Sequence, residues 1–248
     1  IKNSGLYAIY DLGGGTFDCT IANINGDEVD IVTSQGVSKL GGKDFDEQLL
    51  EIVKKKYKKI TKKELPATKY NMNSAEKDKI ELSYQEDIMI FIDEASIEVS
   101  RKEFELSIKN LVQQSMMAVE AAFDSTEYTV DDLQGVILAG GSTRIPYVQS
   151  ELKKLVKLDP EMHDNPDETI ALGAAIYATK KHADNLNPNQ RAAVQDLDLE
   201  EVANKYYGTF AFDHLSGSGK VNSILIEKDT KIPCTVTREY QTLHDGQT

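Results

Sequence analysis

The sequence predicts an α/β domain with a mixed sheet and flanking helices, followed by a partial all-β segment. Three observations carry this prediction. Alternating apolar runs near the start indicate strands, helical periodicity recurs between residues 44 and 180, and residues 202–248 show strand patterns without a helix. A wholly apolar run at 135–139 adds a short strand buried on both faces, as is typical of α/β sheets.

The first elements are three strands within residues 5–34, with a turn at 25–27 between the second and the third. A second glycine turn at 40–43 precedes a helix whose predicted N-cap is Asp44. The lysine-rich end of this helix, residues 54–63, fits a solvated helix terminus better than an anion-binding patch.

The middle of the chain alternates between further helices and strands. Ser100 and Glu103 form a capping box that predicts a long helix through Phe123, on which Met116 and Met117 are expected to pack. The other predicted elements are a helix at 74–83, strands at 88–92 and 97–99, a helix at 146–157 that begins with Pro146, and a helix from 165–168 to about 180. The last of these helices has a face of small residues that permits close packing: Ala171, Gly173, Ala174, Ala175 and Ala178.

The composition changes after residue 182 and suggests three parts: a domain at 1–183, a linker at 184–201 and the start of a β domain at 202–248. In the last part we expect strands at 206–212 and 223–227, and Val236 is expected to begin a third. Since 47 residues of strand are too few for an independent core, this tail is expected to belong to a larger β domain. The chain begins with Ile1 rather than Met, which is expected of a piece of a longer protein.

Composition also excludes some functions. The 41 acidic and 28 basic residues give a net charge of −13, which argues against nucleic acid as the main partner. No apolar stretch approaches the roughly 20 residues of a membrane span, so we expect a soluble, cytoplasmic protein. Cys19 and Cys234 are expected to be buried, reduced thiols, and the four histidines are too scattered to predict a metal cluster or a nucleophile triad.

The segment Tyr10–Asp18 carries the strongest functional signal, because Gly13, Gly14 and Gly15 follow one predicted strand and precede another. Consecutive glycines leave backbone N–H groups open to an anion. Asp11, Thr16 and Asp18 flank them and supply oxygens for a metal ion and a water. A tight hairpin is the simpler alternative, but a hairpin needs two permissive residues rather than three. We therefore predict a phosphate site with a divalent cation. The Walker loop and the dinucleotide fingerprint are excluded, because no helix begins here.

Two further segments fit a nucleotide. Gly140, Gly141 and Ser142 follow the buried strand, at the edge where open α/β sheets place ligands, and the guanidinium of Arg144 suits stacking on a purine. On the helix at 74–83, one face carries a carboxylate, an ammonium and a hydroxyl that suit ribose and adenine, namely Glu76, Lys79 and Ser83. Taken alone, the first segment also fits a packing turn and the second a solvated helix face.

Four motifs in this order closely resemble the 70-kDa heat-shock chaperone family, and they occupy residues 10–18, 40–46, 139–146 and 165–175. The resemblance is strong over about residues 5–182 and weaker beyond. It implies the second lobe of an actin-like, ribonuclease H-like ATPase domain, then a linker and the first strands of the substrate domain. Several positions depart from the family pattern. Lys43 replaces a common Glu, and Ile80 stands where many members have a basic residue, so one side of the adenine site is expected to be apolar. The linker at 196–201 and the tail at 203–207 also depart from it.

The resemblance implies roles for individual residues. The ligand would be ATP or ADP with Mg²⁺. Asp11 would hold the Mg²⁺ through water, and Thr16 would lie at the γ-phosphate of ATP. Asp18 would orient the attacking water. Gly13, Gly14 and Gly15 would cradle the phosphates, with Gly42 on the cleft side. On one side, the adenosine would contact Glu76, Lys79 and Ser83. On the opposite side it would contact Gly140, Gly141, Ser142, Arg144 and Ile145. Asp167 would complete the base pocket.

The resemblance also implies an ATP-dependent chaperone of unfolded, apolar client peptides, with a J-domain co-chaperone and a nucleotide-exchange factor as partners. Because the family's first lobe is not in this sequence, we expect the chain alone to hydrolyse ATP no faster than background. The alternative is a noncatalytic, chaperone-like regulator or scaffold that binds nucleotide. A third class, the actin-like filament proteins, is disfavoured by the linker and the β tail.

Overall fold

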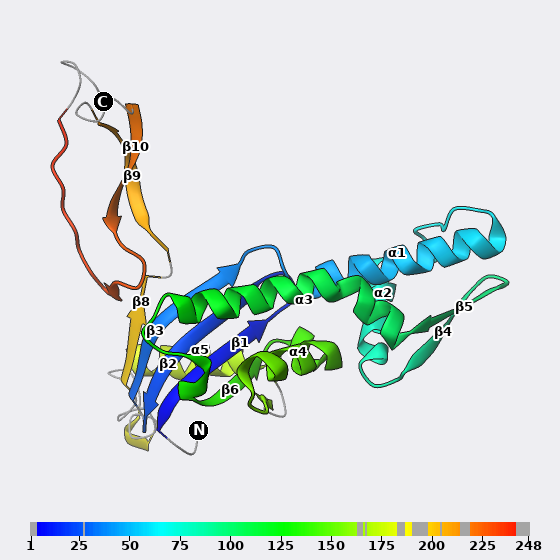
Figure 1. Cartoon of the computed structure of the whole chain (residues 1–248), viewed down its shortest axis with the longest axis horizontal. Coiled ribbons are helices and arrows are strands. Elements are labelled where there is room, and N and C mark those ends of the chain that lie inside the picture. Colours follow the sequence, from blue (N-terminus) through cyan, green and yellow to red (C-terminus); the bar gives the residue numbers. More distant parts are fainter. Residues whose placement is uncertain are drawn as a thin grey trace.

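The computed structural model describes residues 4–26, 28–162, 166, 168–182, 187–189, 198–203, 205–213 and 219–241. A seven-stranded mixed sheet forms its centre, with the strand order β11-β8-β3-β2-β1-β6-β7 (Figure 1). The bounds of these strands are β1 Gly5–Leu12, β2 Phe17–Asn25, β3 Glu28–Val37, β6 Leu133–Ala139, β7 Glu161–Met162, β8 Asp198–Val202 and β11 Lys231–Ile232. The α/β class and the mixed sheet are therefore as predicted.

The three strands near the start form an antiparallel meander, and β6 joins β1 in parallel. Gly26 lies at φ +64° in the turn between β2 and β3, a conformation that favours glycine. Six of the seven residues of β6 are apolar or glycine, and its buried positions cover both faces, as the sequence predicted for a central strand.

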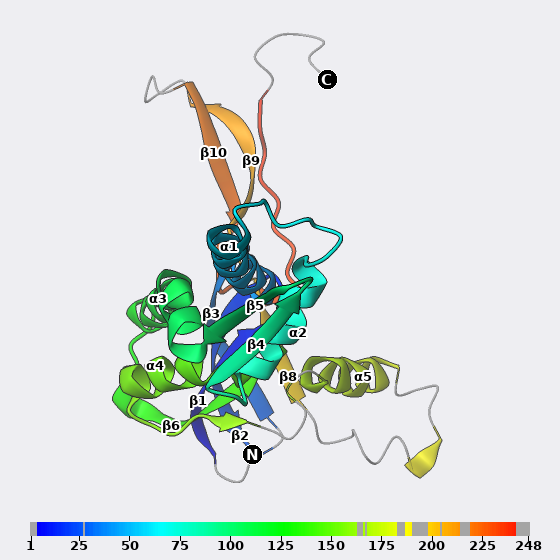
Figure 2. The ribbon, with the colours of Figure 1, turned by 90° about the vertical axis from the view of Figure 1, so that its right-hand side faces the viewer.

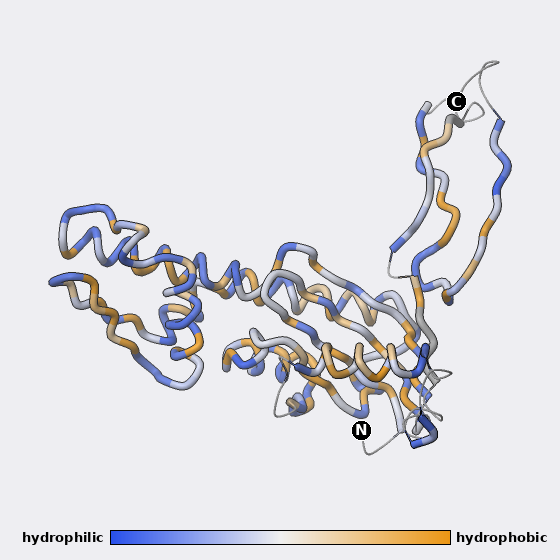
Figure 3. Tube along the Cα trace, turned by 180° about the vertical axis from the view of Figure 1, so that it is seen from behind, coloured by the Kyte–Doolittle hydropathy of each residue, from blue (hydrophilic) through white to orange (hydrophobic). Residues whose placement is uncertain are grey.

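Helices α1 (Gly42–Thr61), α3 (Arg101–Asp124) and α4 (Pro146–Val156) gather on one side of the sheet (Figure 2). The main core lies between them and the sheet, and Figure 3 shows apolar residues concentrated in these layers. Buried side chains recur about every four residues along α3, for example Phe104, Ile108 and Val112, as expected of a helix with one apolar stripe. Tyr10 of β1 reaches Ser115 of α3 through a buried 2.6 Å hydrogen bond, and burial raises the pKa of the tyrosine.

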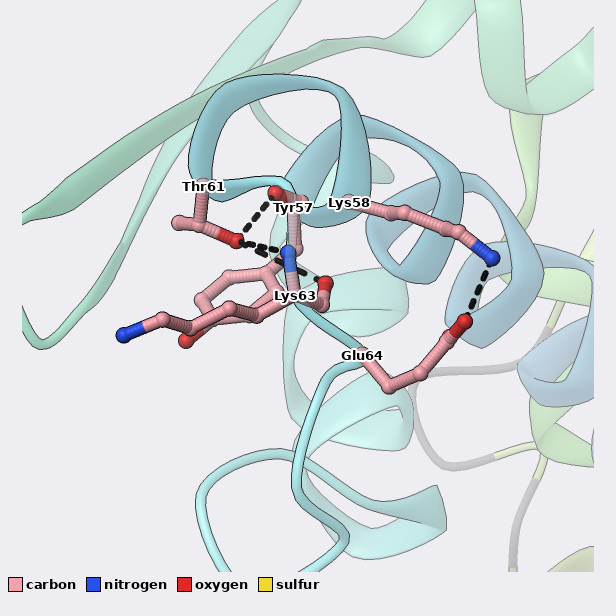
Figure 4. Close-up of polar contacts among 5 residues, drawn as sticks. All are labelled: Tyr57, Lys58, Thr61, Lys63 and Glu64. Carbon is pink, nitrogen blue, oxygen red and sulfur yellow. Dashed lines mark hydrogen bonds and ion pairs between the residues drawn. The ribbon is translucent and has the colours of Figure 1, made fainter.

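A smaller unit stands beyond the end of the sheet. It consists of α2 (Met72–Leu82) and the antiparallel pair β4 (Asp87–Ile92) and β5 (Ala95–Ser100). The lysine-rich end of α1 is exposed and polar, as predicted. Figure 4 shows Thr61 Oγ1 donating to the carbonyl of Tyr57 at 2.8 Å and Lys58 paired with Glu64. None of the described helices combines the length and apolar character needed to cross a bilayer.

The tail departs furthest from the sheet. Strands β9 (Tyr207–Asp213) and β10 (Gly219–Ile226) form a separate antiparallel pair that projects from the sheet edge (Figure 1). Both were predicted, with slightly different bounds. The predicted third strand at Val236 is wrong, because residues 233–241 have no regular structure.

Residues 198–201, the end of the predicted linker, form most of β8, and β8 pairs in parallel with β3 through Glu28↔Asp198 and Asp30↔Glu200. Composition missed this strand because it lies near the edge of the sheet, where polar residues are tolerated, and only the two-residue strand β11 pairs on its outer side.

The start of α1 needs a correction. The N-cap is Gly41, and Asp44 occupies the third helical position, where its carboxylate accepts a 2.8 Å hydrogen bond from the Gly41 amide. A carboxylate at this position reaches back to the cap, so the acid marks the helix start without being its first residue. Ser100 caps α3 and Pro146 begins α4, as predicted. The Glu103 carboxylate pairs with Lys56 and does not complete the predicted capping box.

Two packing predictions are wrong. Met117 is 65% exposed, whereas Met116 packs against the core, because neighbouring residues on a helix point in different directions. No residue of α5 (Thr169–Lys181) is buried, so its face of small residues packs against no described part of the chain (Figure 2). Cys19 is fully buried and its thiol pKa is raised to about 12, whereas Cys234 is only half-buried, and both are free thiols.

Candidate nucleotide site

Three glycine turns meet at the carboxyl ends of β1 and β6. The amides of Gly42 and Lys43 donate to the carbonyls of Gly13 and Gly14 at 2.9 and 2.8 Å. Ser142 Oγ donates to the same Gly13 carbonyl at 3.0 Å. The turns at 13–15, 40–43 and 140–142, which are distant in sequence, therefore form one hydrogen-bonded cluster.

Two glycines are required for this close approach. A Cβ on Gly41 would lie 2.4 Å from the Gly15 amide nitrogen, and a Cβ on Gly140 would lie 2.4 Å from the Leu12 carbonyl oxygen. Gly140 also has φ +82°, which L side chains rarely adopt. Any side chain at either position would push the turns apart.

Gly14 and Gly15 are different, because a Cβ on either would meet open space. Their φ angles are not positive, and the packing of this chain does not explain why they are glycines. Among the described residues, no acceptor receives a hydrogen bond from the amide N–H of Gly14 or Gly15. The tip of the first turn therefore presents bare backbone to solvent, as an anion-binding turn must.

The predicted acids lie directly beside this tip. Asp11 and Asp18 are opposite each other on β1 and β2. Burial, and then the charge of Asp18, raises the pKa of Asp11 above its ordinary value. Burial also raises the pKa of Asp18, while Lys205 opposes the shift. A Cβ on Gly36 would lie 2.4 Å from a carboxyl oxygen of Asp18, although Asp18 as a whole is exposed. Thr16 is exposed between the two acids.

A cavity of about 620 Å³ opens between the glycine cluster and α2. This volume suits a ligand of nucleotide size. Ten of the residues predicted to bind a nucleotide line it: Gly13, Gly14, Gly42, Glu76, Lys79, Ser83, Gly141, Ser142, Arg144 and Ile145. Gly15 and Gly140 each adjoin a lining residue in the chain without lining the cavity themselves, and Thr16 follows Gly15. Asp167 lies outside the described residues.

Six residues outside the predicted binding set also line the cavity, and of these only Ile80 was expected near the adenine: Lys43, Asp46, Met72, Asn73, Ile80 and Tyr84. Four of them lie on or just after α2, at spacings that repeat the face of Glu76 and Lys79. Extending the i, i+4 pattern from Glu76 in both directions reaches Met72, Ile80 and Tyr84. The periodicity of the sequence therefore contained the signal, but it was applied only to polar residues.

Lys79 and Asp46 form a buried pair on the cavity wall. Lys79 Nζ lies 2.8 Å from Asp46 Oδ1, and their side chains are 9% and 6% exposed. The contact is an ion pair by distance, but its angles do not make a hydrogen bond to this oxygen. Lys79 Nζ donates instead to the Gly42 carbonyl at 3.1 Å. Burial raises the pKa of Asp46, and Lys79 opposes the shift. The positive charge of Lys79 therefore compensates the buried carboxylate of Asp46.

The donor set beside the turn suits Mg²⁺. Magnesium commonly binds through one or two carboxylates, waters and the phosphates of a nucleotide rather than in an all-protein cage. Asp11 and Asp18 supply two carboxylates whose mutual repulsion a cation would relieve. No group of three or more acidic, His or Cys side chains suited to a metal occurs among the described residues. The protein alone thus offers part of a coordination shell, next to the bare amides.

The sheet order, the flanking helices and the glycine cluster define an α/β protein of the actin-like ATPase fold class. The family model described as Hsp70 protein matches residues 2–248, so the chain belongs to the Hsp70 family. It is 30% identical over 255 residues to a chaperone protein DnaK of Thermotoga neapolitana and 32% identical over 254 residues to that of Thermosipho africanus. Each alignment covers 97% of this chain and 41% of the relative, so the chain spans about two fifths of the length of these proteins.

Proposed function

We propose that the chain is the part of an ATP-dependent molecular chaperone that holds the nucleotide from one side. The observation that carries the proposal is the single cavity into which the glycine cluster, Arg144 and one face of α2 all project. Ten of the residues that line this cavity are ones that the sequence predicts to bind a nucleotide, and membership in the Hsp70 family agrees with the same ligand.

In this proposal each wall recognises one part of ATP or ADP. Arg144 and Ile145 face the base together with Ile80, and Asp167 completes the base pocket. Glu76, Lys79 and Ser83 contact the ribose and the base edge. Their exposures differ: Glu76 is exposed, Ser83 is intermediate, and Lys79 is held by Asp46 and the Gly42 carbonyl.

The phosphates would lie along the first glycine turn. The free amides of Gly14 and Gly15 suit a phosphate oxygen, and Thr16 would lie at the γ-phosphoryl group. Asp11 and Asp18 would hold Mg²⁺ through water, and the ion would supply charge neutralisation of the phosphates. Asp18 would orient the water whose oxygen forms the new bond to the γ-phosphorus, while the bond to the β-phosphate oxygen breaks in line.

The wider organisation belongs to the same proposal. Residues 1–183 would be the second lobe of the ATPase domain, 184–201 the linker and 202–248 the start of the domain that binds unfolded, apolar peptides. A J-domain co-chaperone and a nucleotide-exchange factor would be partners of the whole, cytoplasmic protein. Because one lobe supplies only half of the electrostatic environment around the phosphates, we propose that the chain alone lacks turnover.

Two substitutions in the full-length protein test the catalytic proposal. Thr16→Ala and Asp11→Asn should each lower steady-state ATP turnover by roughly 10- to 100-fold, because each removes an oxygen that positions or neutralises the reacting group. Nucleotide binding, measured by calorimetry, should persist in Thr16→Ala. Unchanged turnover in both variants would favour the alternative, a noncatalytic regulator or scaffold that binds nucleotide.

A further inference from the structure

Lys43 stands at the junction of the glycine cluster, α1 and the cavity. It is the second residue of α1, and its amide is held by the Gly14 carbonyl at 2.8 Å. Its side chain is exposed and lines the cavity next to Gly13 and Gly14, the turn proposed to receive the phosphates. The backbone of Lys43 is thus fixed while its ammonium group is left at the cavity surface.

The charges of the cavity single out this residue. Five charged side chains line the cavity: Lys43, Lys79 and Arg144 are basic, and Asp46 and Glu76 are acidic. Three positive and two negative charges leave a net +1, in a chain whose total is −13. The ammonium of Lys79 is already paired with Asp46 at 2.8 Å. In the described part of the chain, the ammonium of Lys43 has neither an ion pair nor a hydrogen bond.

The position of Lys43 is also unfavourable in the absence of an anion. A cation in the first turn of a helix opposes the helix dipole, and this typically costs about 0.3–1 kcal/mol. The acid of the first turn, Asp44, directs its carboxylate to the Gly41 amide rather than to the lysine. An anion bound at the first glycine turn would meet both the ammonium and the positive end of α1.

We propose that Lys43 binds the phosphate chain of the nucleotide and so makes the site selective for nucleoside di- and triphosphates over nucleosides. The proposal rests on the proposed function and adds a phosphate-binding side chain to a turn that otherwise offers only backbone. Lys43 contacts the ligand without touching the base, and its contribution therefore depends on the number of phosphates.

The test measures binding of ADP and of adenosine to the full-length protein by titration calorimetry. Lys43→Gln should weaken ADP binding by about tenfold, which is the order expected for the loss of one charge-assisted contact, and should leave adenosine binding within about twofold. Lys43→Arg should retain most of the affinity for ADP. Lys39→Gln is the matched control, since Lys39 is an exposed lysine four residues away that does not line the cavity.

Each other outcome overturns the proposal in a distinguishable way. Equal affinity of Lys43→Gln and the wild type for ADP would exclude the contact while leaving nucleotide binding intact. Equal losses for ADP and adenosine would assign Lys43 a structural role. The same loss in Lys39→Gln would indicate a general charge effect. A wild-type protein that binds neither ligand would refute the proposed function itself.

Discussion

At the scale of single residues, Asp11 and Asp18 show that the site is not arranged for the stability of the chain. Two carboxylates lie opposite each other across β1 and β2, and the pKa of Asp11 is raised by burial and by the charge of Asp18. Like charges directly opposite in a sheet are destabilising by about 0.2–1 kcal/mol. Such an arrangement is expected where function requires the charges.

Asp11→Asn should therefore stabilise the nucleotide-free protein at neutral pH, by about 0.5 kcal/mol in the free energy of unfolding. Because the folded state holds the proton of Asp11 more tightly than the unfolded state, wild-type stability falls as the pH rises through the raised pKa. The gain should thus be present near pH 7 and vanish below the ordinary value of 3.8, where the carboxyl is neutral in both states. Urea unfolding across this pH range measures it.

Asp87→Asn provides the control, because Asp87 is an exposed strand residue with Ser100, rather than an acid, opposite it. A stability of Asp11→Asn below that of the wild type at pH 7 would contradict the account of repulsion.

At the scale of elements, the glycine turns divide into two kinds, and substitution should separate them. Gly41→Ala places a Cβ 2.4 Å from the Gly15 nitrogen and should destabilise the protein by about 1–3 kcal/mol. Gly15→Ala places its Cβ in open space and should change stability by less than about 0.5 kcal/mol, while it weakens ADP binding. Thermal unfolding and calorimetry on the same pair of variants make the comparison. Equal destabilisation by both would show that Gly15 is also a packing glycine.

Sequence reasoning performed best where local chemistry decides an element. The Ser100 cap predicted the start of α3, and Pro146 predicted that of α4. It failed where tertiary contacts decide. Strand β8 has no apolar alternation and depends on β3 and β11 for its pairing. The packing of α5 depends on a surface that local periodicity does not specify.

The site shows the same division. Polar residues with obvious ligand chemistry, such as Glu76 and Arg144, were predicted and line the cavity. Asp46 was missed, because its sequence position indicates only a helix residue, and its burial beside Lys79 results from the packing of α1 against α2. The apolar wall residues Met72 and Tyr84 were missed because apolar side chains on a helix indicate packing as readily as a ligand.

At the scale of the whole molecule, the site and the tail lie at opposite ends. Figure 1 shows α2 beyond one end of the sheet, whereas β9 and β10 project from the other. The only covalent route between the two parts of the described chain passes through β8, which is hydrogen-bonded to β3. The sheet therefore lies between the proposed nucleotide cavity and the proposed peptide-binding part.

The central claim is that the three glycine turns and α2 together receive a nucleotide. A crystal structure of the full-length protein with ADP and Mg²⁺ tests it most directly. The account predicts the base between Arg144 and α2 and the phosphates along Gly13–Gly15, with Asp11 facing the metal. If crystals grown with saturating ADP showed the nucleotide bound elsewhere and only solvent in this cavity, the result would contradict the claim.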